Sequence, residues 1–81
     1  MAAIYLLDVP EFRPIAESAK RQGLAVTELK SGYLRVARPL VLEILRKPTG
    51  VKLPVWFGAP TGGIEGVIAQ FDKDILRVID P

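Results

Sequence analysis

The feature that most constrains this chain is the pair Ser31-Gly32, which lies between two segments of alternating apolar and polar residues. A two-residue connection ending in glycine is typical of a β-hairpin, because glycine readily adopts the backbone conformations of tight hairpin turns. Closing the turn over these two residues places Glu28 opposite Arg35 as an ion pair. The sequence therefore predicts antiparallel strands over about 24–30 and 33–38.

A helix is predicted before this hairpin, over about 13–22, because apolar residues recur there at three- and four-residue spacing. Pro14 suits the first turn of that helix, and Gly23 suits the position just after its last residue. The apolar run at about 3–7 precedes the helix. It is short and rich in β-prone residues, as expected of a buried strand.

The remaining segments are interpreted as strands, although one of them is ambiguous. Residues 40–47 form an apolar segment between prolines that could be a strand or a helix. Its short length favours a strand, whereas its leucine, glutamate and lysine favour a helix. We interpret it as a strand and predict a final hairpin with Phe71 opposite Leu76. The predicted strands lie at about 3–7, 24–30, 33–38, 40–46, 55–59, 64–71 and 75–80.

These elements predict an α+β fold for a single small domain over residues 1–81. One amphipathic helix would pack on a curved, mostly antiparallel sheet of five to six short strands, which could close like a barrel. A domain of this length buries only about 60–65% of the surface that its unfolded chain exposes. Small domains without disulfide or metal crosslinks often gain stability by association, so a homo-oligomer is one expectation.

The chain contains neither cysteine nor histidine, and this excludes several kinds of chemistry. A disulfide, a thiolate zinc site, a cysteine nucleophile and a histidine general base are all impossible within it. Asp72 and Asp74 lack the further oxygen ligands and the glycine of a calcium loop. Glu65, the acid nearest the glycine-rich segment, has no recognisable catalytic partner. We therefore predict no metal, no cofactor and no enzymatic activity, and we expect a cytoplasmic protein without a membrane span.

The segment 55–66 holds the only tryptophan and four of the seven glycines, and it is the candidate functional region. A phosphate-binding loop is a poor fit, because the lysine and hydroxyl pair of such loops is absent and a strand is predicted to follow. A hairpin turn explains the glycines, and neighbouring aromatic residues on a strand point to opposite faces, so one of them would face outward. The residues expected at a contact surface are Trp56, Phe57, Pro60, Thr61, Gly62 and Gly63.

The C-terminal part also carries a family resemblance. The run from Gly66 to Asp72, followed by Leu76 and Val78, resembles the strand-turn-strand core of Sm-like RNA-binding proteins, which have a glycine, an aliphatic residue and an aspartate at similar spacing. Leu76 stands where that family's base-contacting asparagine would fall, and the chain contains no asparagine. The resemblance implies a curved β architecture and carries over no RNA-binding residue.

Charge and composition favour a protein partner over nucleic acid. The net charge is only +2, and the charges are scattered, whereas nucleic-acid binders gather cations on one face. With 49% hydrophobic residues, a small strand-rich domain exposes apolar surface and sheet edges that association would cover. We therefore predict a non-catalytic protein-interaction or assembly module. The alternative is a small barrel-like protein that binds RNA or single-stranded DNA by stacking bases on Tyr33, Trp56 or Phe57.

Overall fold

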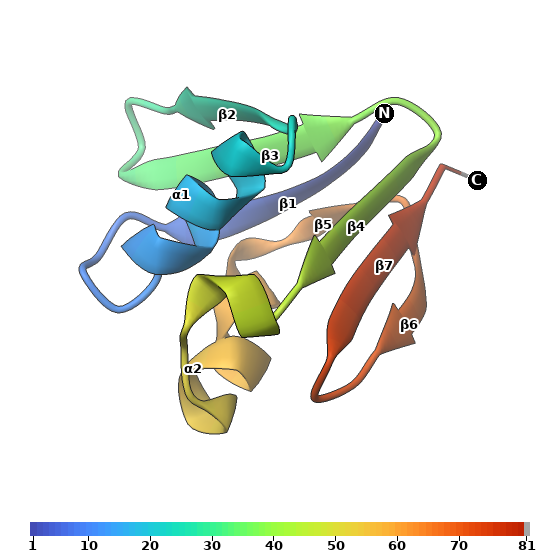
Figure 1. The fold of residues 1–81 in the computed structure, drawn as a ribbon. Coiled ribbons are helices and arrows are strands. Elements are labelled where there is room, and N and C mark those ends of the chain that lie inside the picture. Colours follow the sequence, from blue (N-terminus) through green and yellow to red (C-terminus); the bar gives the residue numbers. More distant parts are fainter. Residues whose placement is uncertain (81) are drawn as a thin grey trace.

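The computed structural model describes residues 1–80, and Figure 1 shows its fold. The chain forms an α+β domain in which every strand pairing is antiparallel, as predicted. Short 3-10 turns cover Lys47–Thr49 and Ala59–Gly62. The main elements, in chain order, are β1 (Ala2–Leu7), α1 (Arg13–Arg21), β2 (Ala25–Glu28), β3 (Tyr33–Arg38), β4 (Val41–Leu45), α2 (Leu53–Gly58), β5 (Ile64–Glu65), β6 (Val67–Phe71) and β7 (Ile75–Ile79).

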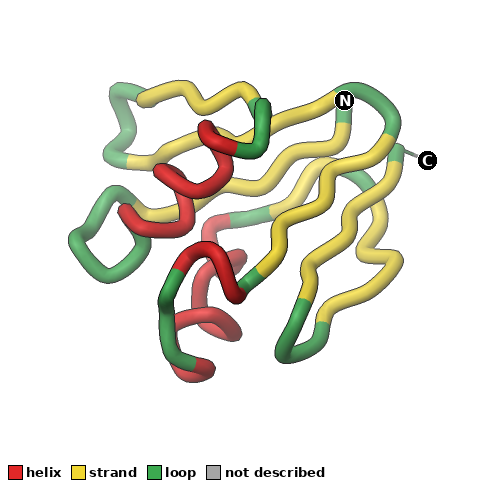
Figure 2. Tube along the Cα trace, in the orientation of Figure 1, coloured by secondary structure: helices red, strands yellow, loops and turns green. Residues whose placement is uncertain are grey.

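The strands form two sheets, which can be followed in the ribbon of Figure 1 and in the Cα tube of Figure 2. The first has the order β2-β3-β1-β5, and the second has the order β4-β7-β6. Both β1 and β2 run antiparallel to β3, so they are parallel to each other, and α1 connects them as in a split β-α-β unit. The strands do not close into a barrel.

Two sharp corners carry the chain from one sheet to the other, a device seen where sheets pack at a steep angle. One corner is Gly66, whose φ is +113°. A Cβ at this position would lie 2.6 Å from the main-chain oxygen of Ile79. For this reason the predicted strand at 64–71 is divided into β5 and β6. The other corner follows β3 at Pro39 and Leu40.

The predicted helix at 13–22 is confirmed as α1 (Arg13–Arg21). Pro14 lies in its first turn. Gly23 has a φ of +86°, and the next N–H, that of Leu24, donates to the Ala19 carbonyl at 3.0 Å. This is the hydrogen bond of a glycine-terminated helix end. The buried face of α1 packs against the core.

The predicted strand at 55–59 is wrong, because residues Leu53–Gly58 form α2. Pro54 occupies the first turn of this helix, where proline is well tolerated, and the Trp56 N–H donates to the Lys52 carbonyl at 3.0 Å. In an apolar run this short, the spacing of the apolar residues fits a strand as well as a helix. The packing of Trp56 therefore determines which of the two forms. In contrast, the interpretation of 40–46 as a strand is confirmed by β4.

The first hairpin forms with a register one residue away from the predicted one. Glu28 lies opposite Leu34 instead of Arg35. The Leu29 N–H donates to the Tyr33 carbonyl at 2.9 Å, so the turn contains three residues and ends at Gly32, which has a φ of +86°. A three-residue turn with its last residue in the left-handed region is a common alternative to the two-residue turn. The predicted ion pair between Glu28 and Arg35 therefore does not form.

The second predicted hairpin is confirmed at its turn, where Phe71 lies opposite Leu76. Beyond that pair the register shifts between Ile68 and Gln70, so a bulge interrupts β6. Bulges are frequent on edge strands, where the ladder can be disrupted without unpairing a second neighbour. The bulge places Ile68 opposite buried Val78.

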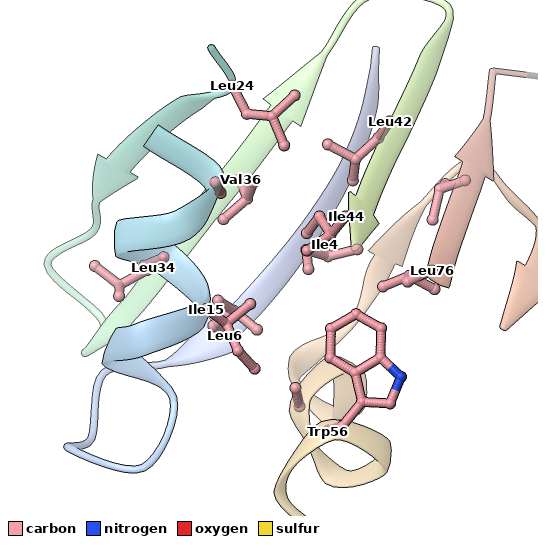
Figure 3. Packing of buried hydrophobic residues seen from close by; sticks show 14 of the residues in the cluster. Ile4, Leu6, Ile15, Leu24, Leu34, Val36, Leu42, Ile44, Trp56 and Leu76 are labelled. Carbon is pink, nitrogen blue, oxygen red and sulfur yellow. The ribbon is translucent and has the colours of Figure 1, made fainter. Parts of the chain in front are cut away.

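The core lies between the two sheets and is closed by α1 and α2 (Figure 3). Each sheet and each helix contributes fully buried side chains to it, so the sheets depend on each other for burial. The largest of these side chains are Trp56, Ile4, Leu6, Ile15, Leu34, Leu42, Ile44 and Leu76.

Candidate interaction surface

The two aromatic residues predicted at a contact surface lie in different environments. Trp56 is a core residue, only 1% exposed, and its indole N–H donates to the Asp72 carbonyl at 2.7 Å. Phe57, the next residue on α2, is 46% exposed. Successive residues of a helix point about 100° apart, so only one of these two rings can enter the core. Phe57 is therefore the ring available to a partner.

The turn Pro60–Gly63 packs against the first sheet rather than beside Phe57. The Tyr5 N–H donates to the Gly63 carbonyl at 3.0 Å, which extends the pairing of β1 with β5. A Cβ at Gly62 would collide with the main-chain oxygen of Tyr5 and would lie 2.8 Å from the Tyr33 ring. Thr61 is exposed, and its hydroxyl donates to the Gly58 carbonyl at 2.9 Å. Close packing thus accounts for Gly62.

The strand β6 was not among the contact residues predicted from the sequence, and it forms an edge of the second sheet. All of its residues except the last are exposed, including Val67 at 51% and Ile68 at 47%. The strand contains no charged residue and no proline, which are the usual features that keep an edge strand from pairing with another chain. It is an apolar strand with one side of its backbone open.

Phe57 extends this apolar edge onto α2. Its ring centroid lies 5.2 Å from that of Phe71, the last residue of β6. Leu53, one helical turn before Phe57, is also largely exposed. We define the β6 surface as the four exposed residues Leu53, Phe57, Val67 and Ile68. By register, Ile68 points toward the core side of the sheet, whereas Val67 and Gln70 point to the other side. Both flanks of the edge therefore carry an exposed apolar residue, and the outer flank also carries the Gln70 amide, which accepts from Arg77 at 3.0 Å.

The other sheet edges are protected. On β2, Glu28 forms an ion pair with Arg13 at 3.3 Å, and β5 is only two residues long. On β4, Val41 and Leu45 are exposed, but the strand carries a charged residue, Glu43, which forms an ion pair with Arg77 at 2.8 Å. Charge and shortness both discourage edge-to-edge pairing, so β6 stands apart from these strands.

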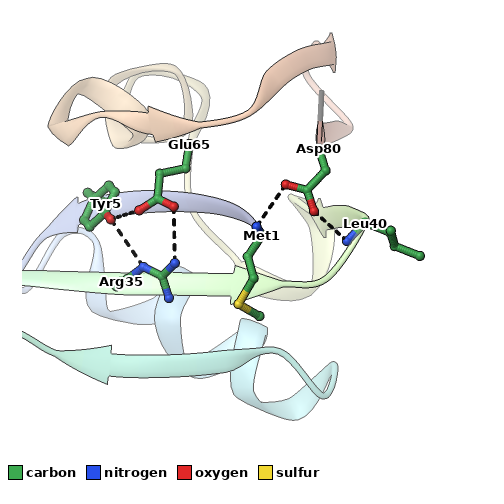
Figure 4. Close-up of polar contacts among 6 residues, drawn as sticks. All are labelled: Met1, Tyr5, Arg35, Leu40, Glu65 and Asp80. Carbon is green, nitrogen blue, oxygen red and sulfur yellow. Dashed lines mark hydrogen bonds and ion pairs between the residues drawn. The ribbon is translucent and has the colours of Figure 1, made fainter.

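A polar cluster joins three strands of the first sheet on the face away from α1 (Figure 4). The Tyr5 hydroxyl donates to Glu65, and the Arg35 guanidinium lies 3.3 Å from both the Tyr5 hydroxyl and the second oxygen of Glu65. The hydrogen bond from Tyr5, and then that from Arg35, lowers the pKa of Glu65. The same hydrogen bonds, led by that of Tyr5, raise the pKa of Arg35.

The cluster has the features of a structural clamp. Each of its polar groups already has a partner within the chain, and together they fasten β5 to β1 and β3. Because Arg35 is engaged by Glu65, this face offers no free arginine to a phosphate group. The cluster therefore supports the fold more than it supports catalysis or binding of nucleic acid.

Neither a metal centre nor a membrane helix can be identified in the described part of the chain. Residues 1–80 contain no group of three or more acidic residues placed to hold a metal ion. No helix among them is long and apolar enough to cross a membrane. Comparisons with protein-family models, with curated proteins and with solved structures found no match to this chain. Any function must therefore be argued from the surface itself.

Proposed function

We propose that this protein is a non-catalytic assembly module that forms a homodimer by pairing β6 with β6 of a second copy. The observation that carries the proposal is the edge strand itself, which exposes an apolar residue on each flank, is uncharged and is open along one side of its backbone. Pairing through such an edge satisfies main-chain hydrogen bonds and buries the side chains on both flanks.

A second copy of this chain is a better partner for β6 than a protein that would offer a highly charged strand. Because β6 carries no charged side chain, two copies meet without bringing like charges together. Two antiparallel β6 strands related by a two-fold axis would join two three-stranded sheets into one of six strands. Each copy would then cover the Val67 and Ile68 side chains of the other.

Phe57 has a defined role in this arrangement. Its exposed ring lies beside Phe71 at the end of β6, so a strand added to the edge would pack against it on the core side. Aromatic residues at the centre of an interface often contribute much of its binding free energy. Phe57 is therefore the member of the predicted contact residues that we retain for partner contact.

The test measures molar mass in solution by sedimentation equilibrium from micromolar to millimolar concentration. We expect the wild-type mass to approach twice the 8.9 kDa of one chain as concentration rises. Val67→Lys places a charge on the open edge and should hold the protein at the monomer mass over the concentrations at which the wild type dimerises, because a buried unpaired ammonium is costly. Thr27→Lys, on the exposed edge strand β2, is the matched control and should leave the dimer intact.

Circular dichroism of both variants checks that the fold is unchanged. A wild-type mass of 8.9 kDa at every concentration would contradict the proposed function. A dimer of Val67→Lys that forms at the same concentrations as the wild-type dimer would contradict pairing through β6.

A further inference from the structure

Leu40 has an unusual backbone conformation at the corner between β3 and β4. It has a φ of +68°, and it is the only residue other than glycine with a positive φ in the described chain. The Val41 N–H donates to the Pro39 carbonyl at 2.8 Å, which closes a three-residue turn around Leu40. A leucine in this region is strained, since its Cβ crowds the main chain. Its side chain is nevertheless 73% exposed, so core packing does not explain the strain.

The main chain of Leu40 is held in place by Asp80 (Figure 4). The Leu40 N–H donates to a carboxylate oxygen of Asp80 at 3.0 Å, and the Asp80 N–H donates to the Leu40 carbonyl at 2.9 Å. The other carboxylate oxygen of Asp80 lies 3.0 Å from the Met1 ammonium. These contacts hold an apolar side chain outward in one backbone conformation, and such preorganisation lowers the entropy cost of binding.

The same chain carries an apolar hollow that could receive this side chain. Val9, Pro10 and Pro14 line an open hollow of about 530 Å³ between the end of β1 and the first turn of α1. Asp8, Arg13 and Glu17 also line it, and Arg13 is already paired with Asp8 at 2.7 Å. A hollow of this size lies in the range that accepts small apolar ligands, so a single leucine side chain can enter it.

Leu40 cannot reach the hollow of its own chain. Arg38, at the end of β3, lies opposite Ala2 at the start of β1, whereas the hollow begins beyond Leu7 at the other end of that strand. Six strand residues span about 17–20 Å, and Figure 1 shows the end of β3 and the loop that follows β1 at opposite ends of the first sheet. A contact between them must therefore join two copies head to tail.

The charges beside the two sites are complementary. Arg38, two residues before Leu40, is exposed and makes no ion pair within residues 1–80. Glu17, which lines the hollow, is likewise exposed and unpaired in that part of the chain. Opposite charges at the rim of an interface favour encounter and fix orientation.

We propose that Leu40 of one copy inserts into the hollow beside Pro10 of a second copy, with Arg38 of the first copy paired to Glu17 of the second. This contact is independent of β6 pairing and uses different surfaces. Because it joins unlike surfaces, each copy that is added presents a new Leu40 and a new hollow, so the contact builds rings or open chains. A contact centred on one side chain is small, so association is expected to be weak.

The test uses the Val67→Lys background, in which β6 pairing is blocked and only the head-to-tail contact remains. Sedimentation equilibrium above the concentrations at which the wild type dimerises, up to about 1 mM, should show a mass above that of the monomer. Adding Arg38→Glu or Glu17→Arg alone should weaken association by about tenfold or more, because each places like charges together. Mixing the two variants restores opposite charges at every contact and should restore association.

Leu40→Gly supplies a second measurement that does not depend on charge. It removes the inserting side chain and also the backbone strain, so association should be lost while the melting temperature rises. A merely structural role for Leu40 would leave association unchanged.

Three results would each overturn the proposal. They are a monomer mass for the Val67→Lys protein at all concentrations, a mixture of the charge variants that stays monomeric, and association that survives Leu40→Gly. None of these outcomes bears on the β6 dimer, which is tested by comparing the wild type with Val67→Lys at the lower concentrations at which the wild type dimerises.

Discussion

The two sheets of this small domain differ in how well residues of the same chain protect their edges. The first sheet has short or charged edges, and its outer face carries the clamp formed by Tyr5, Arg35 and Glu65. The second sheet is closed on its core side but ends in β6, an apolar strand with an open backbone edge. The comparison shows that residues of the same chain cover or protect the edges and outer face of the first sheet. In the second sheet, Val67 and Ile68 of the edge strand β6 stay exposed within one chain.

The largest effect expected from this comparison separates the two neighbouring aromatic residues of α2. Trp56→Ala should lower the free energy of unfolding by about 4 kcal/mol, because it leaves a large cavity and removes the donor to the Asp72 carbonyl. Phe57→Ala should cost far less stability, because the ring is half exposed, but it should weaken the dimer. Urea unfolding and sedimentation of both variants check the pair. Equal loss of stability would show that Phe57 belongs to the core.

A second pair of variants tests how tightly the glycine-rich segment packs on the first sheet. Gly62→Ala should destabilise the fold by about 1–3 kcal/mol, because the added methyl group meets the Tyr5 main chain and the Tyr33 ring. Gly58→Ala is the matched control, since nothing lies within 4 Å of a Cβ there. It should raise stability by up to about 1 kcal/mol through the unfolded state. Similar effects at both positions would contradict the packing assigned to Gly62.

A smaller effect is expected at the corner that joins the sheets. Leu40→Gly should raise the free energy of unfolding by about 1 kcal/mol, because glycine adopts the left-handed backbone without a Cβ clash. The hydrogen bonds between residue 40 and Asp80 involve only main-chain atoms of residue 40, so they should persist. Thermal unfolding provides the measurement, and a lower melting temperature would show that the leucine side chain stabilises the fold.

The smallest effect concerns the clamp and appears as a dependence on pH. Because the pKa of Glu65 is lower in the folded state than its ordinary value of 4.5, its contribution to stability is complete above that value. The contribution is lost as pH falls through the lowered pKa. Unfolding of Glu65→Gln followed between neutral pH and pH 3 should therefore depend less on pH than unfolding of the wild type. Parallel pH profiles would show that the clamp adds nothing to the first sheet.

Local signals in the sequence predict much of the fold. Proline in its first turn and glycine after its end define α1, and the α+β class and the strand β4 are also confirmed. The first hairpin was predicted with the right strands but the wrong register, because Gly32 can end a turn of two residues or of three. The residues of α2 were predicted as a strand, since the burial of Trp56 that decides their conformation depends on the distant residues Phe71 and Asp72.

The candidate surface could be predicted only in part. Phe57 was among the predicted contact residues, whereas Val67 and Ile68 were read as ordinary strand residues. An uncharged run such as β6 is a signal that can be read from sequence, but the same run would suit a central strand. Only the strand order β4-β7-β6 shows that it lies at an edge. Edge exposure is a property of the whole topology, so local sequence patterns do not report it.

The most direct test of the central claim is hydrogen exchange of the main-chain amides of β6, followed by mass spectrometry at low and high protein concentration. The account predicts that exchange of residues Val67–Phe71 slows as concentration rises, because a second β6 strand covers their open edge. Exchange of β2 should not change with concentration, and Val67→Lys should abolish the protection of β6. If exchange of β6 is equally fast at all concentrations in the wild type, the open edge is not an assembly surface and the claim is contradicted.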